Sequence, residues 1–538
     1  MKTTIYLLLM ILYIPSFGVT EKRPKYVKGY VYEDLNNNGL FDDHEPTVKG
    51  VAVSNGRDVV VTDEKGFYQL PLQPQQTIFI SKPSGYSLRT NDYNTMSDFL
   101  HYYPNPTASS YGPTIQQNKE VPEYLNFPLA KVDESSPFTI AMIGDIQARY
   151  QYQVNFAHEI AEELYQYPHL KGAVMLGDMG DDNAGIFPAL NQLFKQFTTT
   201  VYPVAGNHDR NYDIEDVSQD FSAFKKFYGP DQYSFNIGNV HFIAINNVTT
   251  IKGIQYKDYI PKERMDWIRN DLSVVPKDRL IVFLQHIPLG HMLEESRNEL
   301  MEMISEFPYV SSFSGHLHAM THMYLPYGEN NILHEVVTGA TCGLWWGGEL
   351  DLDGIPHGLM GDGSPKGYYL AHFDGNEVTM EYKATGKPKN KQMKIWVYQP
   401  ENAKVDPTIH IPNGLTQNHF LTNIWAGSIH TEVYAQVDDA EWQKLERKEQ
   451  IVDPTARRVY IRDSLKIANR KSHLGPGYPK NLPSHIWVGE FPKDFKDGSH
   501  IIKIKAKDPN GMSFTGYRIF TKGNFDGDYQ EVDWYNME

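Results

Sequence analysis

The order of apolar and polar residues divides the chain into three segments. In the first segment, apolar residues form short runs that glycine, proline and asparagine interrupt, a pattern typical of strands joined by turns. The runs at 59–62, 66–70 and 77–80 are examples. We therefore expect a small β-sandwich at residues 27–131, followed by the polar linker 131–137.

From residue 137 to 387 the pattern changes to alternating strands and helices. Phe156, Ile160 and Leu164, spaced four apart, share one face of a predicted helix. Alternation of this kind predicts an α/β layered domain. The strand-like apolar runs of this segment are 138–143, 172–176, 201–205, 240–245, 280–284 and 309–313.

The third segment, residues 390–538, returns to strand-like runs separated by proline, glycine and aspartate. The clearest runs are 394–398, 500–504 and 517–520. One helix is expected near 440–447. We therefore predict a C-terminal β-rich domain.

Residues 1–18 are typical of a secretory signal peptide. Lys2 gives a positive start, Ile5 to Phe17 is almost entirely apolar, and small residues occur at Ser16 and Gly18. The apolar run is too short for a spanning helix, which needs about 20 residues. We expect a mature chain that is exported to the periplasm or outside the cell, with no stable membrane span. An uncleaved anchor is the alternative.

Fifty basic and 66 acidic side chains give the 538-residue chain a formal net charge of −16. A surface of this sign repels phosphate backbones, which argues against a protein that coats nucleic acid. A small phosphoester is still compatible with it, because bound metal ions would set the local field. Cys342 is the only cysteine in the sequence, so the chain can form no internal disulfide. The sequence gives no indication of the oligomeric state.

Five apolar runs of the middle segment are each followed by a residue of a type that can bind metal ions. Because ligand sites of open α/β sheets lie at the carboxyl edge of the strands, we expect these side chains to converge. Taken singly, each has a simpler interpretation, since a Gly-Asp pair is often a turn or helix cap and a lone His-x-His is often a surface pair. The ordered set predicts one site. Its members are Asp145, Asp178, Asn207, His286, His316 and His318.

The order and spacing of these residues resemble the calcineurin-like metallophosphoesterase family over residues 138–386. That family's signature is Asp-x-His, Gly-Asp, Gly-Asn-His-Asp or Glu, a later His, and Gly-His-x-His. The resemblance implies a multidomain chain in which a central α/β domain, a β-sandwich flanked by helices at 137–387, lies between β-sandwich-like domains. The three-part layout is similar to exported bacterial members of the family.

The resemblance also implies a site for two divalent metal ions. Asp178 would bridge them. The first ion would be bound by Asp145, Asp178 and His318, and the second by Asp178, Asn207, His286 and His316.

One position departs from the family pattern, because Gln147 stands where the family has its first histidine. The amide oxygen of glutamine can bind a metal ion, but it is a harder and weaker ligand than imidazole. The identity of the metals therefore stays open among Mn, Fe, Zn and Mg.

Two such ions would activate a bridging water, and the resulting hydroxide would attack phosphorus in line with the leaving oxygen. His208 suits protonation of the leaving group, and Asp209 is expected to orient its ring. A turn or core histidine is the simpler interpretation of His208. We predict a metal-dependent phosphoesterase and favour a small phosphodiester as substrate. The alternatives are a phosphomonoesterase with the same site and, in view of Gln147, a binding protein with a degenerate site.

Residues 34–45 match the twelve-residue calcium-loop template, with glycine at its sixth position. The flanking residues predict strands rather than the two helices of an EF-hand. Together with 62–68, the loop resembles calcium-binding immunoglobulin-like modules of exported bacterial proteins. A hairpin that binds nothing is the alternative. The predicted ligands of one structural calcium ion are Asp34, Asn36, Asn38, Leu40, Asp42 and Glu45.

Trp345 and Trp346 follow a predicted strand at 335–338 and lie between glycines, which indicates a loop near the metals. Neighbouring side chains on extended backbone point in opposite directions, so we expect at most one of them to face the site. That ring would form an aromatic wall against the organic part of the substrate. The alternative is that both are packing anchors.

Overall fold

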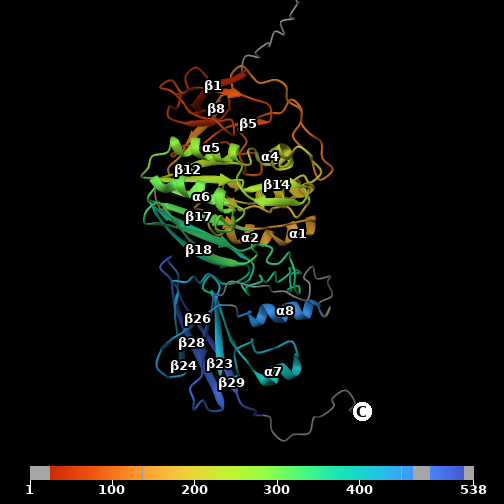
Figure 1. The fold of residues 1–538 in the computed structure, drawn as a ribbon, viewed down its shortest axis with the longest axis vertical. Helices are drawn as coiled ribbons and strands as arrows, with labels where there is room; N and C mark the ends of the chain where they lie inside the picture. Colours follow the sequence, from red (N-terminus) through yellow and green to blue (C-terminus); the bar gives the residue numbers. More distant parts are fainter. Residues whose placement is uncertain (1–24, 135–136, 450, 465–484, 526–538) are drawn as a thin grey trace, which may run out of the picture.

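The computed structural model describes residues 25–134, 137–449, 451–464 and 485–525. The predicted signal peptide at 1–18 lies outside the described residues. Three parts follow one another along the longest axis of the molecule, with the N-terminal part at one end and the C-terminal part at the other (Figure 1). In the described part of the chain, no helix is long and apolar enough to cross a membrane.

The N-terminal part consists of two four-stranded sheets, in the orders β4-β1-β8-β6 and β3-β2-β5-β7. Side chains of both sheets meet in one core, in which Val31, Leu70 and Ile78 are fully buried. This is the β-sandwich that the short apolar runs predict. The strands are β1 (Lys25–Glu33), β2 (Ala52–Ser54), β3 (Val59–Val61), β4 (Phe67–Leu72), β5 (Gln76–Ile80), β6 (Tyr86–Ser87), β7 (Phe99–Tyr102) and β8 (Phe127–Lys131).

Two larger sheets form the centre, in the orders β11-β10-β9-β20-β21 and β12-β13-β16-β17-β19-β18. β9, β10 and β11 run parallel to one another, as do β13, β16 and β17. Such strands are mostly apolar because both of their faces are covered, and every residue of β13 is buried, including its one polar residue, His241. The strands are β9 (Phe138–Ile143), β10 (Leu170–Met175), β11 (Val201–Pro203), β12 (Tyr233–Ile237), β13 (Val240–Ile245), β16 (Leu280–Gln285), β17 (Val310–Ser314), β18 (Met320–Tyr327), β19 (Asn331–Thr338), β20 (Gly367–Asp374) and β21 (Glu377–Ala384), with a separate hairpin of β14 (Val248–Lys252) and β15 (Gln255–Asp258).

Helices lie at the outside of the central sheets (Figure 1). The face of Phe156, Ile160 and Leu164 belongs to two short helices that meet at Ala157, not to one helix. Ile160 and Leu164 are buried, and Phe156 packs against the ring of Trp346. The helices are α1 (Gln151–Phe156), α2 (His158–Leu164), α3 (Phe187–Phe194), α4 (Ser222–Tyr228), α5 (Lys262–Ser273) and α6 (Glu294–Met303).

The C-terminal part is again built from two sheets, in the orders β22-β23-β27-β26 and β25-β24-β28-β29. Phe420 of one sheet and Val433 and Ile504 of the other are fully buried. Two helices accompany the sheets. The elements are β22 (Met393–Val397), α7 (Pro400–Val405), β23 (His419–Ile424), β24 (Glu432–Val437), β25 (Gln443–Lys444), β26 (Glu446–Lys448), α8 (Pro454–Ser464), β27 (Ile486–Glu490), β28 (Gly498–Lys507) and β29 (Ser513–Lys522).

The helix expected at 440–447 is wrong. This segment forms β25 and β26, which pair with β24 and β27 at the edges of the two sheets. Its glutamate, glutamine, lysine and leucine residues favour a helix in isolation. Pairing with the sheets bonds the backbone and buries Leu445, and this tertiary context outweighs the local preference.

The predicted central strands are confirmed. β9 and β13 coincide with the runs 138–143 and 240–245, and the ends of the other runs differ by one or two residues. The fold is therefore the expected multidomain α/β architecture, with a sandwich of two sheets and outer helices at its centre.

Candidate metal centre

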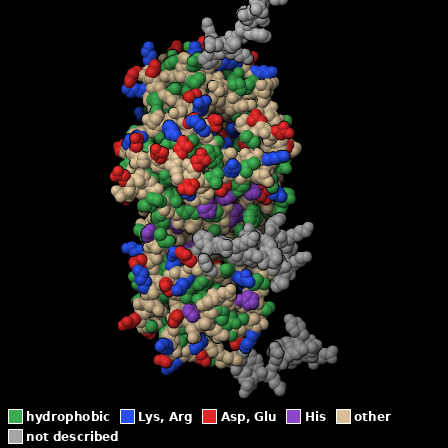
Figure 2. All heavy atoms as spheres, viewed as in Figure 1, with side chains coloured by type: hydrophobic (Ala, Val, Ile, Leu, Met, Phe, Trp, Pro, Cys, Tyr) green, Lys and Arg blue, Asp and Glu red, His purple; other side chains and the backbone are tan. Residues whose placement is uncertain are grey.

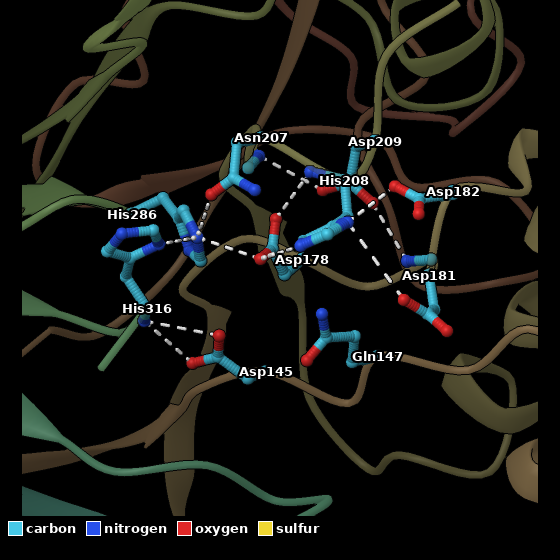
Figure 3. Close-up of polar contacts among 12 residues, drawn as sticks. Asp145, Gln147, Asp178, Asp181, Asp182, Asn207, His208, Asp209, His286 and His316 are labelled. Carbon is cyan, nitrogen blue, oxygen red and sulfur yellow. Dashed lines mark hydrogen bonds and ion pairs between the residues drawn. The ribbon is translucent and has the colours of Figure 1, made fainter. Parts of the chain in front are cut away.

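Residues that follow the carboxyl ends of parallel strands in both central sheets lie together at one site (Figure 3). Asp145 follows β9, Asp178 follows β10 and Asn207 comes shortly after β11. From the other sheet, His286 follows β16 directly and His316 follows β17. Histidine side chains also gather across the middle of the face in Figure 2, at the height of β17 and β18 in Figure 1.

Five side chains of the expected site stand on left-handed backbone. The φ angles are 38° at Asp145, 43° at Gln147, 47° at Asp178, 75° at His316 and 49° at His318. Residues with a Cβ atom adopt this conformation at a cost of about 1–3 kcal/mol, and such residues cluster at functional sites. The geometry therefore favours a functional role over ordinary turns.

Glycines let the loops approach the carboxylates. A Cβ atom on Gly206 would lie 2.3 Å from Asp178 Oδ1, and one on Gly315 would lie 2.5 Å from Asp145 Oδ2. Both distances are far below van der Waals contact. Glycine is therefore required before Asn207 and His316 for steric reasons, because a larger residue would displace the carboxylate of Asp178 or Asp145.

Asp178, His286 and His316 offer ligand atoms within 4.8 Å of one another, close enough to hold one metal ion. Nε2 of His286 lies 3.0 Å from Asp178 Oδ2, 3.0 Å from Asn207 Oδ1 and 3.2 Å from Nδ1 of His316 (Figure 3). Nδ1 of His286 bonds to the carbonyl of Leu176, which leaves Nε2 directed at the group. This arrangement suits a divalent ion with mixed nitrogen and oxygen ligands.

Asp145 and His318 lie beside this group. Nε2 of His318 is 3.6 Å from Asp145 Oδ1, and Nδ1 of His318 bonds to the carbonyl of Gly343. The backbone N–H of His316 donates to both oxygens of Asp145 at 3.0 and 3.2 Å. Asp145 is fully buried and has no cationic lysine or arginine at ion-pair distance in the described part of the chain. A metal ion would supply the missing positive charge.

Gln147 points into the same space and is almost fully buried (Figure 3). Its Nε2 has no hydrogen-bond partner among the described residues, and its Oε1 lies 3.8 Å from the thiol sulfur of Cys342. Because the two ends of an amide are exchangeable by rotation, the unpartnered end can present oxygen to a cation. The buried residue at the departing position is therefore compatible with a metal ligand.

The two histidines after β17 are held neutral. Burial lowers the pKa of His316 to about 3 and the pKa of His318 to about 4, and the positive charge of His286 adds to the shift for His316. Neutral imidazole is the form that binds metals. Burial also raises the pKa of Asp145 to about 7, so a nearby cation would favour its ionised form.

His208 lies next to the metal group with its ring held by acids on one side. Its backbone N–H donates to Asp178 Oδ1 at 2.8 Å, and its Nδ1 lies 2.5 Å from Asp182 Oδ1, which also accepts from the hydroxyl of Tyr212. Asp181 is more distant, at 3.9 Å. Burial alone would lower the pKa of His208, but the charges of Asp178 and Asp182 raise it to about 9.

The role expected for Asp209 is therefore wrong, because Asp182 and not Asp209 contacts the ring of His208. The carboxylate of Asp209 is fully buried and accepts backbone N–H groups from Gly180 and Gly206 at 2.8 and 3.0 Å. Asp209 thus ties the loops after β10 and β11 together. Asp182 was missed, and its signal in the sequence is an acid four residues beyond Asp178 in the same loop.

Of the two tryptophans, only Trp345 lies at the candidate metal centre, which agrees with the expectation that at most one would face it. The backbone conformation that separates the two side chains differs from the expected one. Their backbone is left-handed, with φ of 48° at Trp345 and 54° at Trp346, and not extended. The Trp345 ring lies 4.7 Å from the ring of His318, at the edge of the candidate metal centre. Trp346 is buried and donates its indole N–H to the carbonyl of Ile146, so it is a packing residue.

The expected calcium loop folds around its first and last acids. Asp34 accepts the backbone N–H groups of Asn38 and Gly39, and Glu45 accepts those of Leu35 and Asp42. Both acids are largely buried, at 6% exposure. β1 precedes the loop, so the flanking strand that the sequence predicts is present.

Three family models match consecutive parts of the chain. The model described as the N terminal of calcineurin-like phosphoesterase matches residues 35–116, the model of calcineurin-like phosphoesterase matches 138–320, and the model of the C terminal matches 335–514. Together they cover most of the chain and all of its three parts.

Two curated relatives are phosphodiesterases by name. A probable glycerophosphodiester phosphodiesterase of Arcobacter nitrofigilis is 24% identical over 164 residues, 28% of this chain and 56% of that protein. A 3′,5′-cyclic-nucleotide phosphodiesterase of Nostoc is 24% identical over 162 residues, 28% of this chain and 57% of that protein. The chain thus spans little more than half the length of these relatives. Among solved structures, a purple acid phosphatase from yellow lupin is 12% identical with a TM-score of 0.34, covering 63% of this chain and 68% of its own.

Proposed function

Because this chain belongs to the calcineurin-like phosphoesterases with N- and C-terminal domains, we propose that it hydrolyses a phosphodiester with two divalent metal ions. The observation that supports this best is the group of Asp178, His286 and His316 beside the ring of His208 (Figure 3). A buried ligand group and an adjacent protonated imidazole are the two parts that metal-assisted phosphoester hydrolysis requires.

The ligands would hold two ions, with Asp178 as a ligand of both. Bound there, divalent ions supply Lewis acidity and activate a water molecule for attack on phosphorus. The chain's own residues fit this task, because the carboxylates are buried and the histidines of β16 and β17 converge on them. One ion would be held by Asp145, Gln147, Asp178 and His318, and the other by Asp178, Asn207, His286 and His316.

His208 then protonates the leaving oxygen. Since Nδ1 bonds to Asp182, the ring presents Nε2 toward the metal group, where it lies 3.9 Å from Asp178 Oδ2. Tyr212 shares the same oxygen of Asp182 and limits movement of that carboxylate. The imidazole is thereby both oriented and charged, as a general acid must be.

The surroundings of His208 favour a diester over a monoester. The carboxylates of Asp181 and Asp182 lie on this side of the site, and Arg149 is paired with both at 3.0 Å. A monoester would bring one more negative charge toward these acids than a diester does. The names of the two curated relatives agree with this preference.

Two further properties are part of the proposal. The features of residues 1–18 support export, and the paired acids at the ends of 34–45 support one structural calcium ion. Calcium prefers oxygen ligands of the kind that this loop supplies.

The test uses protein loaded with Mn, Fe, Zn or Mg, with the metal content measured in each case. We expect at least tenfold higher kcat/KM for bis(para-nitrophenyl) phosphate than for para-nitrophenyl phosphate, and no turnover after chelation. His208→Ala should slow alkyl diesters far more than nitrophenyl diesters, because a poor leaving group needs the proton more. Two bound metals with no turnover of any phosphoester would instead favour the degenerate binding protein, with Gln147 as the cause.

A further inference from the structure

The C-terminal part contains two adjoining hollows that phosphoester hydrolysis does not use. The smaller has a volume of about 170 Å³ and is lined by residues of β22, α7 and α8, and the larger has a volume of about 450 Å³. His410 and Pro454 line both, so the hollows form one groove, called here the C-terminal groove. The larger volume falls within the range of about 300–1,000 Å³ that small-molecule sites occupy.

The C-terminal groove is cationic. Lys394, Arg458 and Arg518 line the smaller hollow and Arg457 lines the larger, while no carboxylate is among the lining residues of either. Arg458 is paired with Asp406 at 2.6 Å. In the described part of the chain, the other three cations have no carboxylate within ion-pair distance, and Arg518 makes one long hydrogen bond, of 3.4 Å, to Gln399.

These charges are repulsive to one another without a ligand. Neighbouring groups desolvate the Lys394 ammonium and lower its pKa although the residue is solvent-accessible, and the positive charge of Arg518 lowers it further against the opposing effect of Asp453. The whole chain carries a net charge of −16, so its acidic side chains outnumber its basic ones. The C-terminal groove, which no carboxylate lines, differs in charge from the chain as a whole. A hollow that keeps several cations without acidic partners is suited to an anion, because an anion would relieve their repulsion and gain charge-assisted hydrogen bonds.

The other lining side chains match a sugar. Trp396 is half-buried and contributes an aromatic surface to the smaller hollow, which Gln399 and Asn402 also line. Asn413 adds an amide in the larger hollow. An indole ring packs against the apolar face of a sugar ring, and amides both donate to and accept from hydroxyl groups.

We propose that the C-terminal groove binds an acidic oligosaccharide, a chain of sugar units that carries carboxylate or phosphate groups. Two connected hollows accommodate more than one unit, and the cations that line both hollows recognise the acidic groups. A nucleic acid fits the observations less well, because one tryptophan provides no stacking platform for successive bases and the net charge of the chain repels a phosphate backbone.

The test measures binding of the full chain to dextrans that share one backbone. We expect binding to carboxymethyl dextran, phosphorylated dextran or both, weaker binding at higher salt, and none to unmodified dextran. The double variant Lys394→Ala/Arg518→Ala should lower the affinity at least tenfold. The matched control is Lys493→Ala/Lys496→Ala, which removes the same charge from exposed positions of the same part of the molecule and should change the affinity less than twofold. Turnover of a small diester should be unchanged in both double variants.

Three results would overturn the proposal: no binding to either charged dextran, equal losses in the groove and control variants, or equally tight binding of oligothymidylate. Comparison of the two charged dextrans identifies the acidic group that the groove prefers. The binding measurement needs no turnover, so its outcome is separate from that of the hydrolysis test.

Discussion

Asp178 touches both halves of the candidate site, with one oxygen 3.0 Å from His286 and the other accepting the backbone N–H of His208. Asp178→Asn keeps the shape of the side chain but removes the charge that two cations would share. We expect turnover to fall by at least about 1,000-fold, since both metals contribute to the reaction. Metal content, measured alongside a melting curve, should fall without loss of the fold. Near-native turnover with unchanged metal content would show that Asp178 is not a shared ligand.

The acid beside His208 controls a pH dependence. Burial lowers the pKa of His208, and Asp178 and Asp182 more than reverse this effect, to a value of about 9. The general acid works only when protonated, so hydrolysis of an alkyl diester is lost as pH rises through this pKa.

Asp182→Asn should therefore move the alkaline limb of the pH–rate profile to lower pH by about one unit. Asp181→Asn is the matched control, because its carboxylate is 3.9 Å from the ring and should move the limb less. Equal shifts in the two variants would mean that Asp182 does not hold the proton on His208.

The contrast between Asp209 and Asp182 shows what the sequence can and cannot predict about single residues. Strand ends place the ligands, because parallel strands bring their carboxyl ends to one edge. Which acid reaches His208 depends on the path of the loop after β10. The spacing of apolar and polar residues in the sequence does not predict the path of a loop. Asp209 adjoins His208 in the chain, yet its carboxylate turns to the N–H groups of Gly180 and Gly206.

Among the elements, the loop at 34–45 makes a prediction about stability. A bound ion stabilises the folded state by about 2.7 kcal/mol at a hundredfold excess over its Kd. Added calcium should raise the temperature of one melting transition, and Asp34→Asn should abolish this rise. Asp63→Asn is the control, because Asp63 makes similar turn hydrogen bonds outside the loop. Wild-type protein that melts identically with calcium and with chelator would refute a calcium site.

The loop after β19 makes a second prediction, since its two tryptophans have opposite surroundings. Trp345→Ala should raise KM for a bulky diester and leave a small one nearly unchanged, because its ring lies at the edge of the metal centre. Trp346→Ala should instead lower stability by about 3–5 kcal/mol, as loss of a buried aromatic ring does. Kinetics with two substrate sizes and denaturation curves distinguish these effects. Equal losses on both substrates for Trp345→Ala would make it a packing residue as well.

The type of element could be predicted for strands that are covered on both faces of their sheet. The runs 138–143 and 240–245 are apolar except for Thr139 and His241, and mostly apolar runs of this length are typical of parallel strands with both faces covered. The edge strands β25 and β26 could not be predicted, because they are short, mostly polar and defined by their neighbours. The break between α1 and α2 could not be predicted either, because the apolar residues keep their helical spacing across Ala157.

At the scale of the whole molecule, a buried ion pair lies at the junction between the N-terminal sandwich, the linker and the central part. Lys82 lies 2.5 Å from Glu134 and also donates to the carbonyl of Asn236, and both charged side chains are less than 10% exposed. Lys82→Met would leave the buried carboxylate of Glu134 without its cation, which costs about 3–5 kcal/mol. Denaturant unfolding should show this loss.

Lys49→Met, which removes the exposed pair of Lys49 with Glu64, is the control and should cost less than about 1 kcal/mol. Similar unfolding midpoints for the two variants would mean that the junction between the parts contributes little to stability.

The left-handed backbone under the metal ligands has a consequence for engineering. Each of Asp145, Gln147, Asp178, His316 and His318 occupies a conformation that glycine would adopt at lower cost. Selection for thermal stability alone would replace these residues by glycine, whereas selection for catalysis keeps them. The metal centre therefore lowers the stability of the folded chain for the sake of activity. Stabilising substitutions should be sought in the N- and C-terminal sandwiches, where stability and activity do not conflict.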